Sequence, residues 1–211
     1  MAKFFSYDSK AAQFLSRIWD MLLLNLLLIL GALPVVTLGA SAIAAYTVML
    51  KIVEERDDGI AVPFFQAFKA NLRQGVILTV VLIAIAAAVA ADFVLFEIVA
   101  GNPIGFLILG IASTGLVLVH FFYVFALAAR YRNTLYGHLT NSRNVFFRFF
   151  GRSLLCTLLV AFEVWLFFMT DWLLLFIGVF IAPVLIVGTI SAFSLKCFRV
   201  IESENEGRGE A

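Results

Sequence analysis

The chain has 211 residues, of which 63% are hydrophobic and only 14% are charged. Soluble domains average about 45–50% apolar and about 25% charged residues. The core of a soluble domain of this chain length could not bury so much apolar surface. The formal net charge of +1 argues against a nucleic-acid partner, which usually requires a clearly basic face. Composition therefore predicts an all-α, polytopic membrane helix bundle that forms a single membrane domain.

The first long apolar stretch covers residues 17–53 and is interrupted at Pro34. A helix needs about 20 apolar residues to cross the bilayer, and proline kinks or ends a helix. One interpretation is a hairpin of two short spans that turns at Pro34, with Thr37 as the N-cap of the second span. The other is one kinked span. The first gives six transmembrane helices in three hairpins, and the second gives five.

The polar connection after this stretch predicts an amphipathic helix at the membrane surface. From Pro63 onward, Phe64, Phe68 and Leu72 recur on one helical face, with Lys69 and Arg73 on a neighbouring face. We divide the chain into an interfacial segment (1–16), a first hairpin (17–53), a cytoplasmic loop (54–74), a second hairpin (75–129), a basic aromatic cytoplasmic loop (130–152), a third hairpin (153–195) that Pro183 should kink, and a cytoplasmic tail (196–211) whose end we expect to be disordered.

The distribution of basic residues predicts the orientation. Residues 99–103 and 170–171 contain no lysine or arginine, so we expect both connections outside. Six spans place all fifteen basic residues and both termini in the cytoplasm, whereas five spans place the amino terminus outside. The charges favour six spans. A cleaved signal peptide is the competing interpretation of the first segment, which its length and its residues Asp8 and Asp20 disfavour.

No catalytic or cofactor motif is present. The chain lacks a phosphate-binding Gly-x-x-x-x-Gly-Lys-Ser/Thr loop and a His-Glu-x-x-His pair, and its two histidines and two cysteines do not have zinc-ligand spacing. We therefore expect no enzyme, no cofactor and no metal, and we expect Cys156 and Cys197 to be free packing residues.

Polar residues inside the predicted spans are the candidates for function, because burying a charge in the bilayer is costly. Asp92, Glu163 and His120 could line a polar path, although each could also be a packing residue that is protonated or hydrogen-bonded. Asn25 is expected to form an interhelical hydrogen bond. Glu97 and Asp171 are expected to be wetted at the interface.

Two further features suggest contacts. Small residues dominate positions 39–45 and 84–91, which predicts that these two helices pack closely on each other or on a partner. Basic residues in the predicted cytoplasmic loops would bind anionic lipid headgroups or a soluble partner; they are Lys69, Arg73, Arg130, Arg132, Arg143, Arg148 and Arg152.

The segment Leu33-Pro34-Val35-Val36-Thr37-Leu38-Gly39-Ala40-Ser41, followed by Ala44-Ala45-Tyr46 and Lys51, resembles the YesL-like family. These are small bacterial multi-pass membrane proteins of unknown function, and Pro34, Thr37 and Gly39 belong to the signature. Residues 64–74 fit the family's first cytoplasmic loop. The resemblance implies the bacterial cell membrane, provides no catalytic residues, and implies a role near sugar import because family genes often lie beside carbohydrate-uptake genes.

Two hypotheses about function remain. The first is an accessory or structural component associated with carbohydrate uptake, with the lipid bilayer and a sugar-transport permease or its associated proteins as partners. The alternative is a small self-sufficient carrier or channel that uses Asp92, Glu163 and His120.

Overall fold

The computed structural model describes residues 10–56, 58–99, 101, 103–169 and 171–209, and within them the chain is helical with no β-strand. The predicted interfacial segment 1–16 lies largely outside the described residues. The elements in chain order are α1 (Lys10–Ala32), η1 (Val35–Thr37), α2 (Leu38–Val53), α3 (Ala61–Ala70), α4 (Leu72–Ile98), α5 (Ile104–Phe121), α6 (Val124–Arg130), α7 (Leu135–Arg148), α8 (Phe150–Phe168) and α9 (Trp172–Gly209).

Six stretches of helix are long and apolar enough to cross a membrane, which confirms the prediction of a polytopic all-α protein. They are Leu15–Ala32, Val35–Val53, Leu72–Ile98, Ile104–Arg130, Phe150–Phe168 and Trp172–Gly207.

The break at Pro34 separates α1 from α2, so the first apolar stretch forms two helices rather than one kinked helix. Thr37 precedes α2 but does not cap it, which corrects the prediction. Its hydroxyl lies 2.7 Å from the carbonyl oxygens of both Gly31 and Pro34, to which it can donate. Because the hydroxyl faces the end of α1, it stabilises the turn instead of the first turn of α2.

Helix α2 is the centre of the fold and packs against α1, α3, α4, α6 and α9. Ten of its sixteen residues are buried, from Gly39 to Leu50. The small residues at its start explain the close packing. The Ser41 hydroxyl donates to the Leu28 carbonyl of α1 at 2.7 Å, and a Cβ added at Gly39 would lie 2.4 Å from the carbonyl oxygen of Gly75 in α4.

The predicted close packing between the second and third spans is therefore present, but Gly75 provides it rather than the alanines further along α4. A Cβ added at Gly75 would lie 2.3 Å from the backbone nitrogen of Ala40. Thr79 extends this junction, because its hydroxyl accepts a hydrogen bond from the Gly39 N–H at 2.7 Å and donates to the Gly75 carbonyl at 2.9 Å. The alanines between positions 84 and 91 are exposed.

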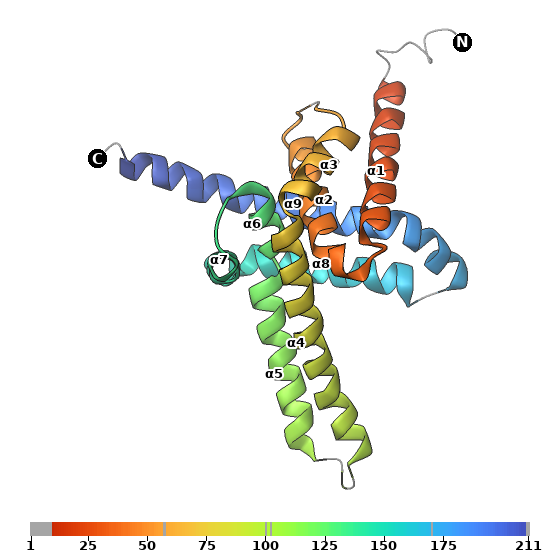
Figure 1. Ribbon diagram of the computed structural model, residues 1–211, viewed down its shortest axis with the longest axis vertical. Coiled ribbons are helices and arrows are strands. Elements are labelled where there is room, and N and C mark those ends of the chain that lie inside the picture. Colours follow the sequence, from red (N-terminus) through yellow and green to blue (C-terminus); the bar gives the residue numbers. More distant parts are fainter. Residues whose placement is uncertain (1–9, 57, 100, 102, 170, 210–211) are drawn as a thin grey trace.

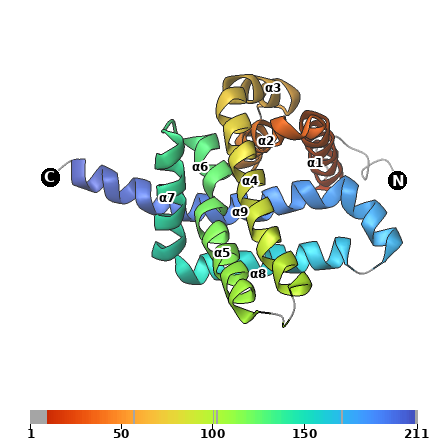
Figure 2. The same ribbon diagram turned by 60° about the horizontal axis from the view of Figure 1, so that its bottom comes forward.

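The second and third hairpins extend from this core in different directions. Figure 1 shows α4 and α5 side by side, projecting away from the rest of the chain, while α8 and α9 form another hairpin that crosses them. Figure 2, from another angle, shows the same divergence. The far half of the α4–α5 hairpin consequently has few protein neighbours, and its apolar side chains are exposed.

The predicted amphipathic helix exists as α3, although it begins at Ala61 and ends at Ala70. Phe64 is buried and stacks on Phe68 with ring centroids 6.2 Å apart. Leu72 is the first residue of α4, so the prediction that it continues the same helical face is wrong. Lys69 and Arg73 are exposed.

The carboxyl-terminal segment corrects another expectation. We predicted a polar tail from residue 196 with a disordered end, yet α9 continues as one helix to Gly209 and passes through Pro183 on the way. Ion pairs hold this polar part, because Glu202 and Glu204 pair with arginines of α6 and α7. The sequence analysis did not identify these partners.

Candidate functional site: a polar pocket between α6, α7 and α9

Arg130, the last residue of α6, joins three parts of the chain. Its Nε and Nη2 atoms donate to the two carboxylate oxygens of Glu202 in α9 at 2.8 and 3.0 Å. Its Nη1 atom donates to Glu54 after α2 at 2.7 Å. The Tyr131 hydroxyl donates to the same Glu202 carboxylate at 2.6 Å. This geometry is the bidentate arrangement in which arginine–carboxylate pairs are strongest.

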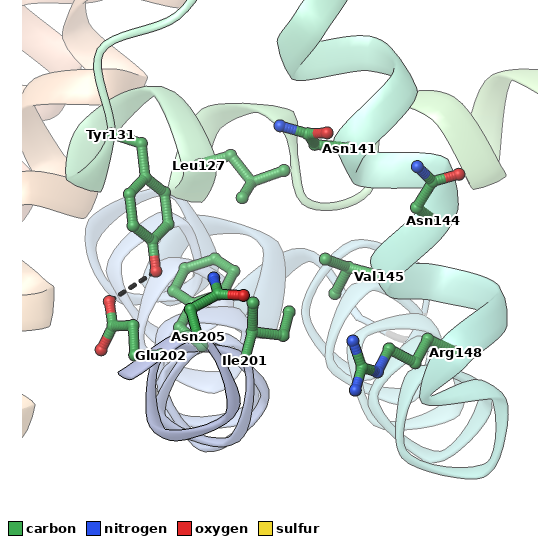
Figure 3. Close-up of a pocket in the computed structure, with 10 residues that line it drawn as sticks. Leu127, Tyr131, Asn141, Asn144, Val145, Arg148, Ile201, Glu202 and Asn205 are labelled. Carbon is green, nitrogen blue, oxygen red and sulfur yellow. Dashed lines mark hydrogen bonds between the residues drawn. The ribbon is translucent and has the colours of Figure 1, made fainter. Parts of the chain in front are cut away.

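Next to this network is a pocket of about 310 Å³, within the range typical of small-molecule sites. Figure 3 shows side chains from α6, α7 and α9 around it, with the Tyr131–Glu202 hydrogen bond at one side. Its apolar side chains are Leu127, Val145, Phe198 and Ile201, and its polar side chains are Tyr131, Asn141, Asn144, Arg148, Glu202 and Asn205.

The charges around the pocket are paired within the chain. Arg148 forms an ion pair with Glu204, and both side chains are about half exposed (47% and 40%). Such a pair contributes little to stability because water screens it. Burial and the Glu202 carboxylate raise the pKa of Tyr131 above its usual value, so this phenol stays a hydrogen-bond donor. The pocket can therefore bind a small polar group, but it contains no nucleophile paired with a base.

Sequence reasoning found Arg130 and Arg148 but missed their partners. Glu202 was assigned to the polar cytoplasmic tail and Glu54 to the first cytoplasmic loop, and neither was given a partner. The available signal was the four glutamates between residues 202 and 210, which could pair with the loop rich in arginine.

The other basic candidates are exposed: Arg132, Arg143 and Arg152. Arg148 and Arg152 also lie over the ring of Phe149, at 5.6 and 5.8 Å from its centroid.

Among the described residues, no hydrogen bond or ion pair joins the three residues of the predicted polar path to one another. Glu163 in α8 accepts a hydrogen bond from Thr189 of α9 at 2.6 Å, and its other carboxylate oxygen is buried without a partner. The Nδ1 atom of His120 lies 2.9 Å from the Leu116 carbonyl of its own helix. Asp92 lies in the far part of α4, half-buried, while Glu97 and Asp171 are exposed.

Asn25 confirms the prediction of an interhelical hydrogen bond and has a specific role. Pro183 has no N–H and disturbs the hydrogen-bond ladder of α9. The Asn25 carboxamide of α1 enters the gap: its Nδ2 donates to the Phe180 carbonyl at 2.7 Å, and its Oδ1 accepts from the Val184 N–H at 3.1 Å. In a regular helix these two backbone groups would bond to each other.

Ser142 of α7 makes the same kind of bridge where the predicted fourth span is interrupted. The chain leaves α5 at Phe121 and resumes as α6 at Val124. The Tyr123 N–H donates to the Ser142 hydroxyl at 3.1 Å, and that hydroxyl donates to the Val119 carbonyl at 3.4 Å. Residues 119 and 123 are again a pair that a continuous helix would join directly. Ser142 was not a sequence-level candidate, because a serine between two spans has no distinguishing pattern.

Within the described residues no group of three or more His, Cys, Asp or Glu side chains could hold a metal ion. Cys156 and Cys197 are both buried and free, as predicted.

His138 of α7 is buried, and neither of its ring nitrogens has a hydrogen-bond partner. Burial lowers the pKa of His138, so the ring is held in its neutral form.

The six candidate spans among the described residues indicate a multi-pass integral membrane protein. Residues 21–93 match a family model described as a protein of unknown function, DUF624. This segment covers α2, α3, about half of α1 and most of α4, and it includes the Gly39–Gly75 junction. Neither the curated proteins nor the solved structures include a match.

Proposed function

We propose that this protein is a non-enzymatic accessory subunit of a membrane transport system, in which the outward face of α4 binds a transmembrane helix of the transporter. The resemblance to YesL-like proteins supports carbohydrate uptake as the process, a sugar permease as the partner and the bacterial cell membrane as the location. Both termini then lie in the cytoplasm, together with the basic loops.

The observation that carries this proposal is the outward face of α4, which consists of Val80, Ala84, Ala87, Ala91, Val94 and Ile98. All six are exposed, and they recur at alternating intervals of four and three residues. This repeat makes a straight seam along a helix that packs against another helix. The three alanines in its middle let a second backbone approach closely, which is what drives helix association in lipid.

Other features of the chain support a binding role over catalysis. Within the described residues the buried polar groups pair mostly with backbone groups of neighbouring helices, as Asn25 and Ser142 do. Among these described residues, no group of three or more His, Cys, Asp or Glu side chains could hold a metal ion. The carrier alternative has less support, because Asp92, Glu163 and His120 are not linked, although the unpartnered oxygen of Glu163 keeps it testable.

The test is purification of the tagged chain from its native membranes in mild detergent, followed by identification of companions present in stoichiometric amounts. We expect a transport permease or its ATPase to copurify. The variant Ala87→Phe places a bulky ring in the middle of the outward face and should remove the companion. Ala112→Phe is the matched control, because Ala112 is an exposed small residue of α5 outside this face.

Recovery of the wild-type chain alone, as a single monodisperse species, contradicts the accessory role. Equal recovery of the companion with Ala87→Phe and Ala112→Phe contradicts the assignment of the α4 face. Both variants should be present at wild-type levels, because neither position is buried in the described structure.

A further inference from the structure

A groove of about 540 Å³ lies between the second and third hairpins, separate from the polar pocket and from the outward face of α4. Val117 and Phe121 line it from α5, and Ala161 and Trp165 line it from α8. Tyr46 of the central helix α2, which is only 5% exposed, forms part of its inner wall. The groove lies where the two hairpins diverge, and α6 and α9 contribute further lining through Phe125 and Ile190.

Tyr46 lines the groove, and none of the side-chain hydrogen bonds found among the described residues involves its hydroxyl. Tyrosine hydroxyls usually find a partner when they are buried, because an unsatisfied polar group in an apolar environment is costly. Tyr123, another buried tyrosine of the same core, does so, since its hydroxyl lies 3.0 Å from that of Ser153. Tyr46 thus presents one unused hydrogen-bond donor in a groove whose other lining is almost entirely apolar.

The surroundings of the groove indicate its occupant. Both α5 and α8 belong to candidate membrane spans, and the groove opens onto their apolar surfaces, because its lining residues Leu118 and Trp165 are 38% and 54% exposed. The groove is open and almost entirely apolar, and it lies between candidate membrane spans, so a hydrocarbon chain of the surrounding bilayer can enter it.

We propose that one hydrocarbon chain of a single membrane lipid occupies this groove, and that an oxygen atom of the lipid accepts a hydrogen bond from Tyr46. The lipid fills the angle between the hairpins and holds them in the divergent arrangement of Figures 1 and 2.

Tryptophan fluorescence tests this proposal directly, because Trp165 lines the groove and the chain has only three tryptophans. The double variant Trp19→Phe/Trp172→Phe keeps Trp165 alone. The control Trp19→Phe/Trp165→Phe keeps Trp172, which is 89% exposed at the start of α9 and outside the groove. Each full-length variant in detergent micelles is titrated with a phosphatidylglycerol that carries brominated acyl chains, which quench nearby indoles.

We expect quenching of Trp165 to saturate at one lipid per chain, and quenching of Trp172 to follow the lipid content of the micelle without saturating. Ala161→Phe, added to the Trp165 variant, fills the groove and should remove the saturable part. Ala112→Phe should leave it unchanged. Tyr46→Phe conserves volume and removes one hydrogen bond, so it should weaken binding about threefold to tenfold.

Quenching of Trp165 that follows micelle content as Trp172 does would overturn the site, as would saturable quenching that survives Ala161→Phe. Protection of Trp165 from the brominated lipid would also overturn it, because a protein surface would then cover the groove. Unchanged affinity in Tyr46→Phe would overturn the hydrogen bond.

Discussion

The carboxamide oxygen of Asn25 accepts a hydrogen bond from the backbone N–H of Val184, at 3.1 Å and across 159 residues of sequence. The same carboxamide donates to the carbonyl of Phe180, so one side chain of α1 replaces the backbone hydrogen bond that is lost beside Pro183. Asn25 thereby satisfies the backbone groups that Pro183 leaves unpaired, so the proline can lie inside the last span. The same hydrogen bonds connect α1 to α9.

We predict that Asn25→Leu destabilises the protein, because it leaves the Phe180 carbonyl and the Val184 N–H without partners. Unsatisfied buried groups cost about 1–3 kcal/mol each, although hydrogen bonds in membranes often contribute less, near 0.6 kcal/mol. The measurement is reversible unfolding in mixed micelles. With Pro183→Ala the backbone ladder can re-form, so Asn25→Leu should cost less in that background. Equal costs in both backgrounds would show that Asn25 does not bridge the break.

The Gly39–Gly75 contact predicts that Gly39→Ala and Gly75→Ala lower the free energy of unfolding. The added Cβ atoms would lie 2.4 Å and 2.3 Å from backbone atoms of the facing helix. Overpacking of this kind typically costs about 1–3 kcal/mol. Gly115→Ala is the matched control, since Gly115 lies in α5 with nothing within 4 Å of its Cβ position. There we expect no loss, and a gain of up to about 1 kcal/mol from helix propensity.

Arg130→Gln should release the polar end of α9. The substitution leaves Glu54 and Glu202 without their shared cation, and both carboxylates are more buried than exposed. We expect a loss of about 1–3 kcal/mol and faster proteolysis after residue 196. Arg132→Gln, at an exposed position two residues away, serves as the control. A proteolysis rate for Arg130→Gln equal to that of the control would mean that the α9 extension does not depend on this ion pair.

His138 predicts a pH dependence of stability. Burial lowers its pKa in the folded state below the usual value of 6.5, so the unfolded chain binds a proton first as pH falls. The contribution of neutral His138 to the free energy of unfolding is therefore fully present above about pH 7. It decreases by up to about 1.4 kcal/mol per pH unit as the pH falls from 6.5 to the pKa of the folded state. Thermal unfolding from pH 8 to pH 5 measures this decrease. His138→Phe should remove the part of the slope that His138 contributes, and an unchanged slope would assign it to other groups.

The carrier alternative makes a separate prediction, which concerns Glu163. If the protein moves a solute by itself, Glu163→Gln or Asp92→Asn should abolish uptake in vesicles while the protein level is unchanged. Under the accessory role, purified vesicles have no uptake to lose. Glu163→Gln then affects only stability, and only modestly, because Gln can still accept the hydrogen bond from Thr189.

The sequence predicted most of the fold because the bilayer constrains it strongly. Apolar length identified the candidate spans, the distribution of basic residues favoured six spans over five, and Pro34 placed the break between the first two. The sequence did not predict the helical end of α9 or the break between α5 and α6. These features depend on hydrogen bonds between residues that are separated in the chain, Arg130 to Glu202 and Tyr123 to Ser142. The pocket was missed for the same reason, because its polar side chains come from two helices that local patterns treated as a loop and a tail.

The most direct test of the accessory role is photo-crosslinking in living cells from a benzophenone amino acid placed at Ala87, on the outward face of α4. The account predicts an adduct of defined mass that contains a transport permease, and no such adduct from the same group at Ala112. Only lipid adducts at Ala87, or equal adducts at the two positions, would contradict it.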